Sequence, residues 1–332
     1  MKNKILNILR ENGCISGEKI SSMLNISRTA VWKQINNLKK EGYEISSSRK
    51  GYTLEAKPDK LIIAEIKYAL ATKSWGKGEM FLFETIDSTN MEGKRLANAG
   101  KPEGTVIISE EQSAGRGRKG REWQSAPLKG LWFSLILRPN ISPFKATQLT
   151  FVIAIGVVKA LQNLFPSEDI KIKWPNDIVY NGKKIAGILT EISSEIERIN
   201  HLVVGIGVNV NHEENDFENA SVDPLRIKAT SLKIESGRKI NRIKTLQEIL
   251  KETEKWYNIY IESGFEIITE EWKNNSVTIG KDVIVYTDNE EISGRALDID
   301  EIGALILRDN EGKERKIVAG DVSLRRTDGS YV

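Results

Sequence analysis

The sequence of 332 residues predicts a multidomain α+β chain. Three observations carry this prediction. Apolar residues recur at helical spacing near the N-terminus, apolar runs of strand and helix length alternate through the middle, and a period-two pattern begins after Asn274-Asn275. A chain of this length is expected to form two or three domains. We expect them at residues 1–60, 61–274 and 275–332, with a mixed α/β domain in the centre.

The composition is ordinary for a globular protein, with 39% hydrophobic and 29% charged residues. The net charge of +3 is distributed unevenly. Residues 1–57 hold 11 Lys and Arg against 5 Asp and Glu, whereas residues 273–332 hold 9 against 12. The positive excess therefore lies at the N-terminal end, which favours a polyanionic partner for that end only.

The chain has one cysteine, Cys14. This excludes an internal disulfide framework and a cysteine-based zinc cluster, and we expect Cys14 to be a small buried residue. His201 and His212 are too isolated in the sequence to indicate a metal site. The sequence has no signal-type segment and no apolar run of about 18 residues, so we expect a cytoplasmic protein with no membrane partner.

Three short helices are predicted in the first 42 residues. An apolar stripe runs through residues 5–9, a second short helix covers 16–24, and Ser27 is a suitable N-cap for a third. Val31, Ile35 and Leu38, at i, i+4 and i+7, form the core face of the third helix. Residues 43–45 and 52–54 have the pattern of two strands around a basic tip.

This order of elements is the layout of a winged helix-turn-helix. In that motif the third helix enters the major groove of DNA, while the hairpin reaches the backbone or the minor groove. A small three-helix protein-interaction domain is the alternative, and the positive charge and basic tip favour DNA. The residues predicted to contact DNA are Arg28, Thr29, Trp32, Lys33 and Asn36 of the third helix and Arg49 and Lys50 of the hairpin tip.

The central domain opens with a predicted helix at 63–71 and a strand at 80–84, and a further strand at 106–109 leads to Gln112. Residues 87–90 (Asp-Ser-Thr-Asn) precede a helix that is expected to begin near Met91. Short polar side chains at this point suit either a helix N-cap or a ligand-binding turn. By themselves these residue types favour the cap.

Residues 113–123 (SAGRGRKGREW) combine glycines with clustered cations. Glycine lets backbone N–H groups approach a ligand closely, and guanidinium groups suit phosphate or carboxylate. An aromatic residue, Trp123, follows at once. This composition predicts a loop that closes over an anion with a flat base attached, as in a nucleotide or an acyl-adenylate.

Three alternatives apply to the same loop. Its Gly-x-Gly-x-x-Gly spacing matches a dinucleotide fingerprint, but a strand-like segment (131–137) follows where that motif requires a helix. A protein-kinase glycine-rich loop needs His-Arg-Asp and Asp-Phe-Gly downstream, and the sequence has neither. A solvated basic loop or a nucleic-acid arm remains open on this stretch alone.

Residues 151–164 are apolar almost all round and predict a buried helix, too short to span a membrane. The strand that begins at residue 170 cannot continue regularly past Pro175, so Asn176 and Asp177 project from a fixed turn. Asn181-Gly182 predicts a type I′ hairpin turn. Lys184 lies at the start of the returning strand, where a surface lysine is the usual outcome.

Residues 203–211 (VVGIGVNVN) predict a strand whose glycines allow close approach by a ligand or another backbone. The polar segment 212–228 predicts a mobile loop or lid. A long helix at 241–263 and a shorter helix through Trp272 should follow. Five short strands then predict a small SH3-like β-barrel, at 277–279, 283–286, 292–297, 304–307 and 317–318.

Five motifs in this order closely resemble those of biotin–protein ligases: DSTN at 87–90, QSAGRGRKGREW at 112–123, KWPND at 173–177, KIAGIL at 184–189 and GIGVN at 205–209. With a winged helix in front, the chain resembles the bifunctional BirA type, which also represses biotin genes. The resemblance covers essentially the whole chain and implies a central domain like that of class II synthetases. It further implies that ATP and Mg²⁺ activate biotin to biotinoyl-5′-AMP, and that biotin is then passed to a lysine of a biotin carboxyl carrier protein domain.

The resemblance also implies a role for each matching residue. Catalytic roles are implied for Arg118, Lys184 and Asp177, with Asp177 also a candidate Mg²⁺ ligand. Adenylate binding is implied for Arg121, Trp123, Asn176 and Asn209. Biotin binding is implied for Ser88, Thr89, Asn90, Gln112, Gly115, Arg116, Gly117, Arg118 and Lys184.

Operator DNA and a homodimer promoted by the bound adenylate are further partners that the resemblance implies. Two other functions stay open. One is a lipoate–protein ligase-like acyltransferase of related fold, although the arginine-rich loop and the KWPND motif favour biotin. The other is a winged-helix biotin sensor without catalysis, although Lys184 and the intact loop argue against it.

Overall fold

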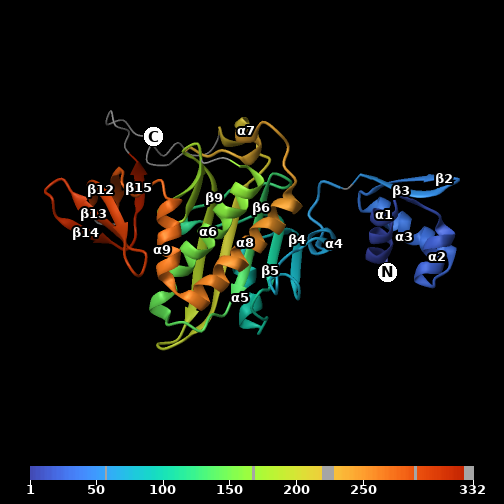
Figure 1. The fold of residues 1–332 in the computed structure, drawn as a ribbon, viewed down its shortest axis with the longest axis horizontal. Helices are drawn as coiled ribbons and strands as arrows, with labels where there is room; N and C mark the ends of the chain where they lie inside the picture. Colours follow the sequence, from blue (N-terminus) through green and yellow to red (C-terminus); the bar gives the residue numbers. More distant parts are fainter. Residues whose placement is uncertain (57, 167–168, 219–227, 288–289, 325–332) are drawn as a thin grey trace. The chain divides into compact units, whose positions relative to one another are not determined.

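The computed structural model of the chain describes residues 1–332 except 57, 167–168, 219–227, 288–289 and 325–332 (Figure 1). It divides into two compact units, residues Met1–Lys60 and Leu61–Val332. The predicted lid at 212–228 lies in part outside the described residues.

The first unit contains three helices and a three-stranded antiparallel sheet of order β1-β3-β2, which confirms the predicted winged helix-turn-helix. The Ser27 side chain accepts the N–H of Ala30 at 3.1 Å and caps the third helix, as expected. Val31, Ile35 and Leu38 are at most 1% exposed and form its core face. The elements are α1 (Lys2–Asn12), β1 (Cys14–Ile15), α2 (Gly17–Leu24), α3 (Arg28–Lys40), β2 (Glu44–Ser48) and β3 (Gly51–Ala56).

Cys14 is exposed, so the expectation of a buried cysteine is wrong. It lies in β1, a two-residue edge strand that pairs with β3. Successive side chains of a strand point to opposite faces of the sheet. Ile15 takes the buried position, and Cys14 therefore faces solvent.

The second unit is built on a seven-stranded mixed sheet of order β4-β5-β6-β10-β9-β8-β7. Only the β4–β5 pair is parallel, and the remaining neighbours pair antiparallel. Asn181 and Gly182 both have positive φ, which confirms the predicted hairpin turn. The strands are β4 (Met80–Ile86), β5 (Val106–Gln112), β6 (Gly130–Leu137), β7 (Ile170–Lys173), β8 (Asp177–Tyr180), β9 (Lys183–Ser194) and β10 (Ile199–Asn209).

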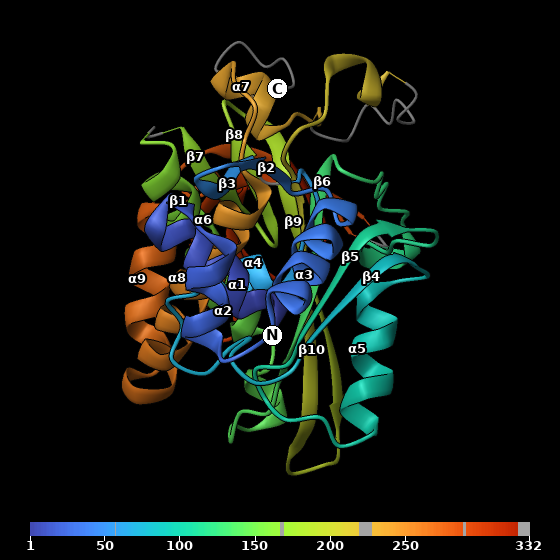
Figure 2. The ribbon, with the colours of Figure 1, turned by 90° about the vertical axis from the view of Figure 1, so that its right-hand side faces the viewer.

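Helices cover the two faces of this sheet unequally (Figure 1). On one face, α6 packs on β7, β8 and β9, α8 packs on α6 and β6, and α9 packs on α6. On the other face, α5 crosses β5, β6 and β10 (Figure 2). The helices are α4 (Ile63–Tyr68), α5 (Thr89–Asn98), α6 (Gln148–Leu164), α7 (Leu232–Ser236), α8 (Arg242–Ser263) and α9 (Phe265–Asn274).

The alternation of side chains along β6 and β10 separates the core from the site. Phe133, Leu135, Val204 and Ile206 belong to the main hydrophobic core with α6 and α8. The intervening residues of β10 and β9 that face α5 include Gly205, which pairs with Ser134 of β6 and Leu189 of β9. Small residues at these positions leave open the surface on which the site is built.

A five-stranded antiparallel sheet of order β14-β13-β12-β11-β15 completes the second unit. The predicted strand at 277–279 is wrong, because Val277 donates its N–H to Ile172 and the preceding residues extend the edge of β7 instead. The fifth strand is β15, which the period-two pattern did not reveal. The strands are β11 (Asp282–Tyr286), β12 (Glu291–Ile299), β13 (Leu305–Asp309), β14 (Glu314–Ile317) and β15 (Asp321–Leu324).

The apolar helix predicted at 151–164 is confirmed as α6, the central helix of the core. The helical stretch Pro143–Leu164, which contains α6 and the 3₁₀ turn Pro143–Lys145, has the length and hydropathy of a membrane span, but 72% of its most apolar window is buried inside the fold. This burial identifies it as a core helix.

Candidate functional site

A cavity of about 1160 Å³ opens on the α5 side of the seven-stranded sheet. It is large enough for two small molecules, since a site for one drug-sized ligand commonly measures about 300–1000 Å³. Of the catalytic, biotin-binding and adenylate-binding residues that the sequence predicts, all but Gly115 line it. These are Ser88, Thr89, Asn90, Gln112, Arg116, Gly117, Arg118, Arg121, Trp123, Asn176, Asp177, Lys184 and Asn209.

The cationic loop, residues 115–121, forms the first arm and the tip of a short hairpin rather than the start of a helix. The N–H of Trp123 donates to Gly115 O at 2.9 Å, and the N–H of Gly117 donates to Arg121 O at 2.7 Å. The tip is a 3₁₀ turn, Arg118–Gly120, within which Lys119 has a φ of 56°. Because no α-helix follows the glycines, the structure disagrees with the dinucleotide interpretation.

Gly115 packs closely against the second arm of the hairpin. A Cβ at this position would lie 2.3 Å from Trp123 O and 2.8 Å from Ser125 Oγ. Any larger residue would therefore separate the two arms of the hairpin. Gly115 shapes the cavity wall without forming part of its lining.

Two arginines of the loop are held by residues distant in sequence. Arg121 makes two hydrogen bonds to the carboxylate of Asp321 in β15, at 3.0 and 2.5 Å. Burial opposes ionisation of Asp321, but the hydrogen bond from Arg121 and the charges of Arg121, Lys119 and Arg118 together outweigh burial and lower the pKa of that carboxyl. Arg118 donates to Asn176 Oδ1 at 3.2 Å. The loop is thus tied both to the C-terminal sheet and to the turn after β7.

The turn after β7 places an amide and a carboxylate beside this loop. The Trp174–Pro175 bond is cis, and Asn176 follows it. Asn176 donates its Nδ2 to Ile188 O at 2.7 Å, so its Oδ1 is turned toward Arg118. Asp177 forms an ion pair with Lys184, with 2.6 Å between Asp177 Oδ1 and Lys184 Nζ.

Lys184 reaches the cavity and is not the surface lysine that its position favoured. Its side chain is 26% exposed, and its Nζ lies 5.2 Å from the ring centroid of Trp123. The neighbouring Lys183 instead pairs with Glu235 at 3.0 Å and is 46% exposed. Because adjacent side chains of a strand point to opposite faces, Lys184 points into the cavity and Lys183 points away from it.

Lys173 is a further cation of the cavity, which sequence reasoning did not single out. It ends β7 opposite Asp177, lines the cavity and is 6% exposed. Burial lowers the pKa of Lys173 to about 8, although Asp177 opposes the shift. Burying an ammonium is costly unless an anion compensates for it. Its presence indicates that the cavity is built for a strongly anionic ligand.

The opposite end of the cavity is a buried network of polar side chains. Gln112 Oε1 accepts from the N–H of Thr89 at 2.8 Å and from its hydroxyl at 3.1 Å. Gln112 Nε2 donates to Ser125 Oγ at 2.7 Å. Ser134 Oγ, which is fully buried on β6, lies 2.8 Å from Thr89 Oγ1 and 2.6 Å from Asn90 Oδ1.

The motif at 87–90 serves this network rather than a side-chain helix cap. Ser88 occupies the N-cap position of α5, but its side chain makes no capping hydrogen bond, so that part of the interpretation is wrong. Ser88, Thr89 and Asn90 are each at most 4% exposed. They are the first residues of a helix whose N-terminus opens on the cavity, which is why residue types typical of caps appear there.

Trp123 lines the same cavity, with Lys184 beside its ring. Its ring lies against β10 and β9, where a Cβ on Gly207 would lie 2.6 Å from the ring and one on Gly187 would lie 3.0 Å away. Its Nε1 is buried without a hydrogen-bond partner in the described part of the chain. The two glycines thus provide a flat floor for an aromatic side chain, consistent with the close approach that the GIGVN stretch predicts.

Further aromatic rings line the side of the cavity near the segment 212–218. The ring of His212 stacks on that of Phe217, which lies in a 3₁₀ turn (Glu214–Phe217), with centroids 5.2 Å apart. It meets Trp132 edge to face at 5.9 Å. Burial lowers the pKa of His212 to about 4, so the ring is neutral at physiological pH. Asn209, the last residue of β10, donates to Thr230 O at 3.0 Å.

The fit of the site to Mg²⁺ can be judged from its carboxylates. Within the described ranges, no three His, Cys, Asp or Glu side chains lie together as a protein-built metal site would require. Asp177 is a cavity carboxylate and is engaged by Lys184. Mg²⁺ is commonly bound by one or two carboxylates together with substrate phosphates. The residues present fit that mode and not an all-protein cage.

The exposed side of α3 carries most of the residues predicted to contact DNA. Arg28, Thr29, Trp32 and Lys33 are exposed, with Trp32 58% exposed, whereas Asn36 is only partly exposed. The predicted residues of the hairpin, Arg49 and Lys50, are exposed at the turn between β2 and β3. A basic helix face and a basic turn therefore coexist in the first unit.

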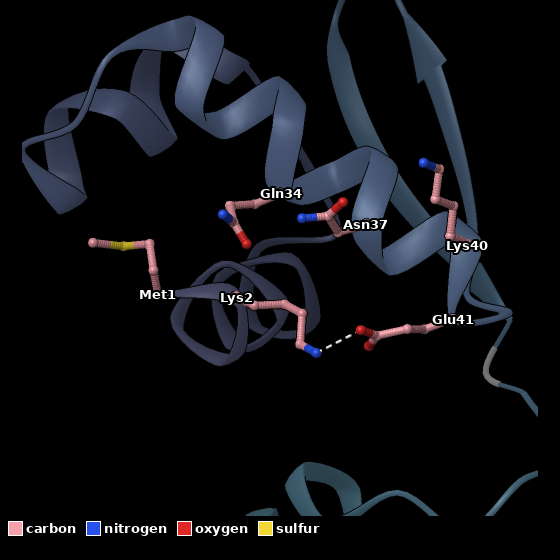
Figure 3. A pocket seen from close by; sticks show the side chains of 6 residues that line it. All are labelled: Met1, Lys2, Gln34, Asn37, Lys40 and Glu41. Carbon is pink, nitrogen blue, oxygen red and sulfur yellow. Dashed lines mark hydrogen bonds and ion pairs between the residues drawn. The ribbon is translucent and has the colours of Figure 1, made fainter.

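A smaller hollow of about 530 Å³ also lies in the first unit, between the start of α1 and the end of α3 (Figure 3). Its lining includes an ion pair between Lys2 and Glu41 at 2.6 Å, and both side chains are more than a third exposed. Its other lining residues are Met1, Gln34, Asn37 and Lys40. These are surface side chains without a buried polar cluster, so we do not assign a ligand site to it.

Fold and cavity together define a class of protein. A mixed sheet carries a cavity lined by a buried polar network, by aromatic rings and by clustered cations, and the same chain begins with a winged helix-turn-helix. Such a chain joins a domain that binds anionic small molecules to a unit of the kind that binds DNA.

Known proteins with the same organisation are found by comparison. Residues 82–209 match the Biotin/lipoate A/B protein ligase family, residues 2–53 match an HTH domain, and residues 278–325 match the Biotin protein ligase C terminal domain. The chain is 44% identical over 314 residues to the bifunctional ligase/repressor BirA of Bacillus subtilis, covering 94% of each chain. It is 34% identical to the biotin–[acetyl-CoA-carboxylase] ligase of Paracoccus denitrificans over 69% of this chain and 93% of that one.

A solved structure agrees with these relatives. The biotin protein ligase of Aquifex aeolicus in complex with biotin and ATP superposes with a TM-score of 0.61 at 29% identity, over 75% of this chain and all of that chain. The chain therefore belongs to the family of bifunctional biotin protein ligases and repressors represented by BirA.

Proposed function

We propose that the protein is a biotin–[acetyl-CoA-carboxylase] ligase that also represses transcription of biotin genes. The observation that carries this proposal is that one cavity has two kinds of lining. A buried polar network and the cations Arg118, Lys173 and Lys184 line the same cavity. One ligand with a neutral polar ring and an anionic tail fits the polar network, and a nucleotide phosphate fits the cations.

The polar end is the proposed site for the ureido ring of biotin. The hydroxyl of Ser88 and one N–H of Gln112 have no partner among the contacts of the described residues, and both side chains line the cavity. Thr89 lies between them and is held by Gln112 and Ser134. A ring bearing one carbonyl and two N–H groups can bond to such a mixture of donors and acceptors.

The first chemical step joins biotin to AMP. A carboxylate oxygen of biotin attacks the α-phosphorus of ATP, an O–P bond forms, and the bond to the departing pyrophosphate breaks. The protein must hold two anions together, and unit charges about 4 Å apart repel by roughly 4 kcal/mol at an effective dielectric constant of 20. Arg116, Arg118, Lys173 and Lys184 offset this repulsion and the charge that develops on the phosphorus.

The second step transfers biotin to the carrier protein. The amine of one carrier lysine attacks the acyl carbon of biotinoyl-AMP and the bond to the phosphate oxygen breaks. AMP leaves, and the proton that the amine loses passes to solvent. We assign Asp177 the role of orienting that lysine, since its carboxylate already binds an ammonium group, that of Lys184. Protein nucleophiles are unnecessary, because both nucleophiles belong to the substrates.

Mg²⁺ is proposed to arrive on the phosphates of ATP. It would supply charge neutralisation, and Asp177 is the proposed protein ligand for it. The adenine is proposed to lie against Trp123, with Asn176, Asn209 and Arg121 around the nucleotide. Arg121 acts there mainly through its ion pair with Asp321, which fixes the loop.

The proposed partners follow from the two units. The central and C-terminal parts meet the biotin carboxyl carrier protein domain, and the winged helix-turn-helix meets operator DNA through α3 and the turn at Arg49 and Lys50. A winged helix reads one half-site, so an inverted repeat needs two copies. We propose that bound adenylate promotes this homodimer in the cytoplasm. Sedimentation with and without biotin and ATP tests the coupling.

A lipoate–protein ligase activity is the second candidate, because the matching family model spans both biotin and lipoate ligases. The polar network argues against it, since lipoate has no ureido group to use these donors and acceptors. Mass spectrometry of the protein mixed with ATP, Mg²⁺, a carrier domain and either biotin or lipoate decides between them. We expect the adenylate and the modified lysine with biotin only, and modification with lipoate only would overturn the proposal.

A further inference from the structure

Asn90 spans three strands at the polar end of the cavity. Its Nδ2 lies 2.9 Å from Glu191 Oε2 and 3.2 Å from Leu189 O on β9, and its Oδ1 lies 2.6 Å from Ser134 Oγ on β6. The side chain crosses Gly205 of β10, where a Cβ would lie 2.2 Å from Oδ1. Both amide protons are therefore used inside the protein, and ligand contacts fall to the neighbouring side chains.

Glu191 holds this amide from outside the cavity. It accepts from Asn90 through one oxygen and from Lys94 Nζ through the other, at 2.5 Å. Asn90 and Lys94 are four residues apart on α5 and lie on the same face of the helix, so both can donate to the carboxylate of Glu191. Glu191 does not line the cavity. Its hydrogen bond to Asn90, which does line the cavity, connects Glu191 to the site.

The charge of Glu191 fixes the direction of the hydrogen bonds that follow. A carboxylate and a backbone carbonyl can only accept, so Nδ2 of Asn90 must face them and Oδ1 must face Ser134. The single hydroxyl proton of Ser134 then has an obligatory acceptor in Oδ1. With that proton committed, only the Thr89 hydroxyl proton can bridge the 2.8 Å contact between Ser134 Oγ and Thr89 Oγ1, so Ser134 competes for it with Gln112 Oε1 at 3.1 Å. Thr89 lines the cavity. The orientation of the Asn90 amide that Glu191 imposes thus influences the hydroxyl of Thr89 by way of Ser134.

We propose that Glu191, held by Lys94, is a positioning residue for biotin recognition, which fixes the Asn90 amide and through Ser134 the hydroxyl of Thr89. This inference rests on the proposed function, because biotin is the ligand for which the network is oriented. A glutamine at 191 could present its own N–H to Asn90 Oδ1, and it would lose the attraction of Lys94. The network would then have two orientations of similar energy instead of one.

The test measures biotinoyl-AMP formation by the full-length protein at varied biotin and varied ATP. For Glu191→Gln we expect the KM for biotin to rise about tenfold, which corresponds to one charged hydrogen bond, with the KM for ATP unchanged. Lys94→Met should also raise the KM for biotin, whereas Lys94→Arg, which keeps the positive charge, should have the wild-type KM for biotin. Glu195→Gln is the matched control, because Glu195 lies in the same β9–β10 hairpin and its ion pair with Arg198 is exposed.

A double-mutant comparison separates positioning from a general structural role. Asn90→Ala alone should raise the KM for biotin, and adding Glu191→Gln should raise it no further, because Glu191 acts through Asn90. Additive effects, an equal rise in the KM for ATP, or an unchanged KM for biotin in both Glu191→Gln and Lys94→Met would overturn this inference. A wild-type protein that forms no biotinoyl-AMP would instead contradict the proposed function itself.

Discussion

Replacing Lys184 by methionine should disable adenylation while leaving the fold intact. The ammonium group of Lys184 lies 2.6 Å from Asp177 and 5.2 Å from the centre of the Trp123 ring, inside the cavity. Losing one preorganised donor to a developing oxyanion costs about 3 kcal/mol, or roughly a hundredfold in rate. Asp177 keeps a second cation nearby, because Lys173 pairs with it across β7 and β8, so the fold should survive the loss of this ion pair.

The assay is a single-turnover measurement of AMP transfer from labelled ATP to biotin, with protein in excess. Lys183→Met is the matched control, since Lys183 is the adjacent residue of β9 and pairs with Glu235 at the surface. We expect Lys183→Met to retain the wild-type rate and Lys184→Met to lose about two orders of magnitude. A Lys184→Met rate within twofold of wild type, with an unchanged thermal midpoint in both variants, would refute the role assigned to Lys184.

Three further predictions concern other parts of the molecule. Gly205→Ala places a Cβ 2.2 Å from Asn90 Oδ1, so calorimetric titration should show biotin binding weakened by roughly 30-fold or more, and wild-type affinity would contradict the packing. Fluorescence titrations with duplex DNA at several salt concentrations should show that Lys33→Ala binds more weakly and that the salt dependence of its affinity is smaller by about one counterion. Lys4→Ala on α1 should change neither quantity. His212 has a pKa of about 4 in the folded protein but protonates near pH 6.5 when unfolded, so the free energy of unfolding falls as the pH drops from 6.5 toward 4. Chemical unfolding at pH 7 and pH 5 should show this free energy fall by about 2 kcal/mol, and the fall should be absent in His212→Phe.

The elements that depend on local pattern could be predicted well from the sequence. Ser27 caps α3 as expected, and Asn181-Gly182 forms the hairpin turn, because both depend on backbone conformations that few residue types favour. Helix α6 follows from a run that is apolar almost all round. Cys14 was misplaced because a two-residue strand is too short for its alternation to show which side chain faces the core.

The site was only partly predictable, for a physical reason. The residues that match the family motifs line the cavity, but the groups that orient them come from distant parts of the chain. Asp321 holds Arg121 across 200 positions, and Glu191 holds Asn90 across 101. Ser134 lies in an apolar strand, where a serine alone gives no signal. Ser88 resembled a capping residue because the first turn of a helix and a ligand-binding turn favour the same short polar side chains.

The most direct test of the account is a crystal structure of the protein with biotin and ATP bound. We predict that the loop of residues 115–121 closes on a mixed anhydride of biotin and AMP, with Lys184 on its phosphate and the ureido ring beside Thr89 and Gln112. A loop that points into solvent while the anhydride binds elsewhere would contradict the account.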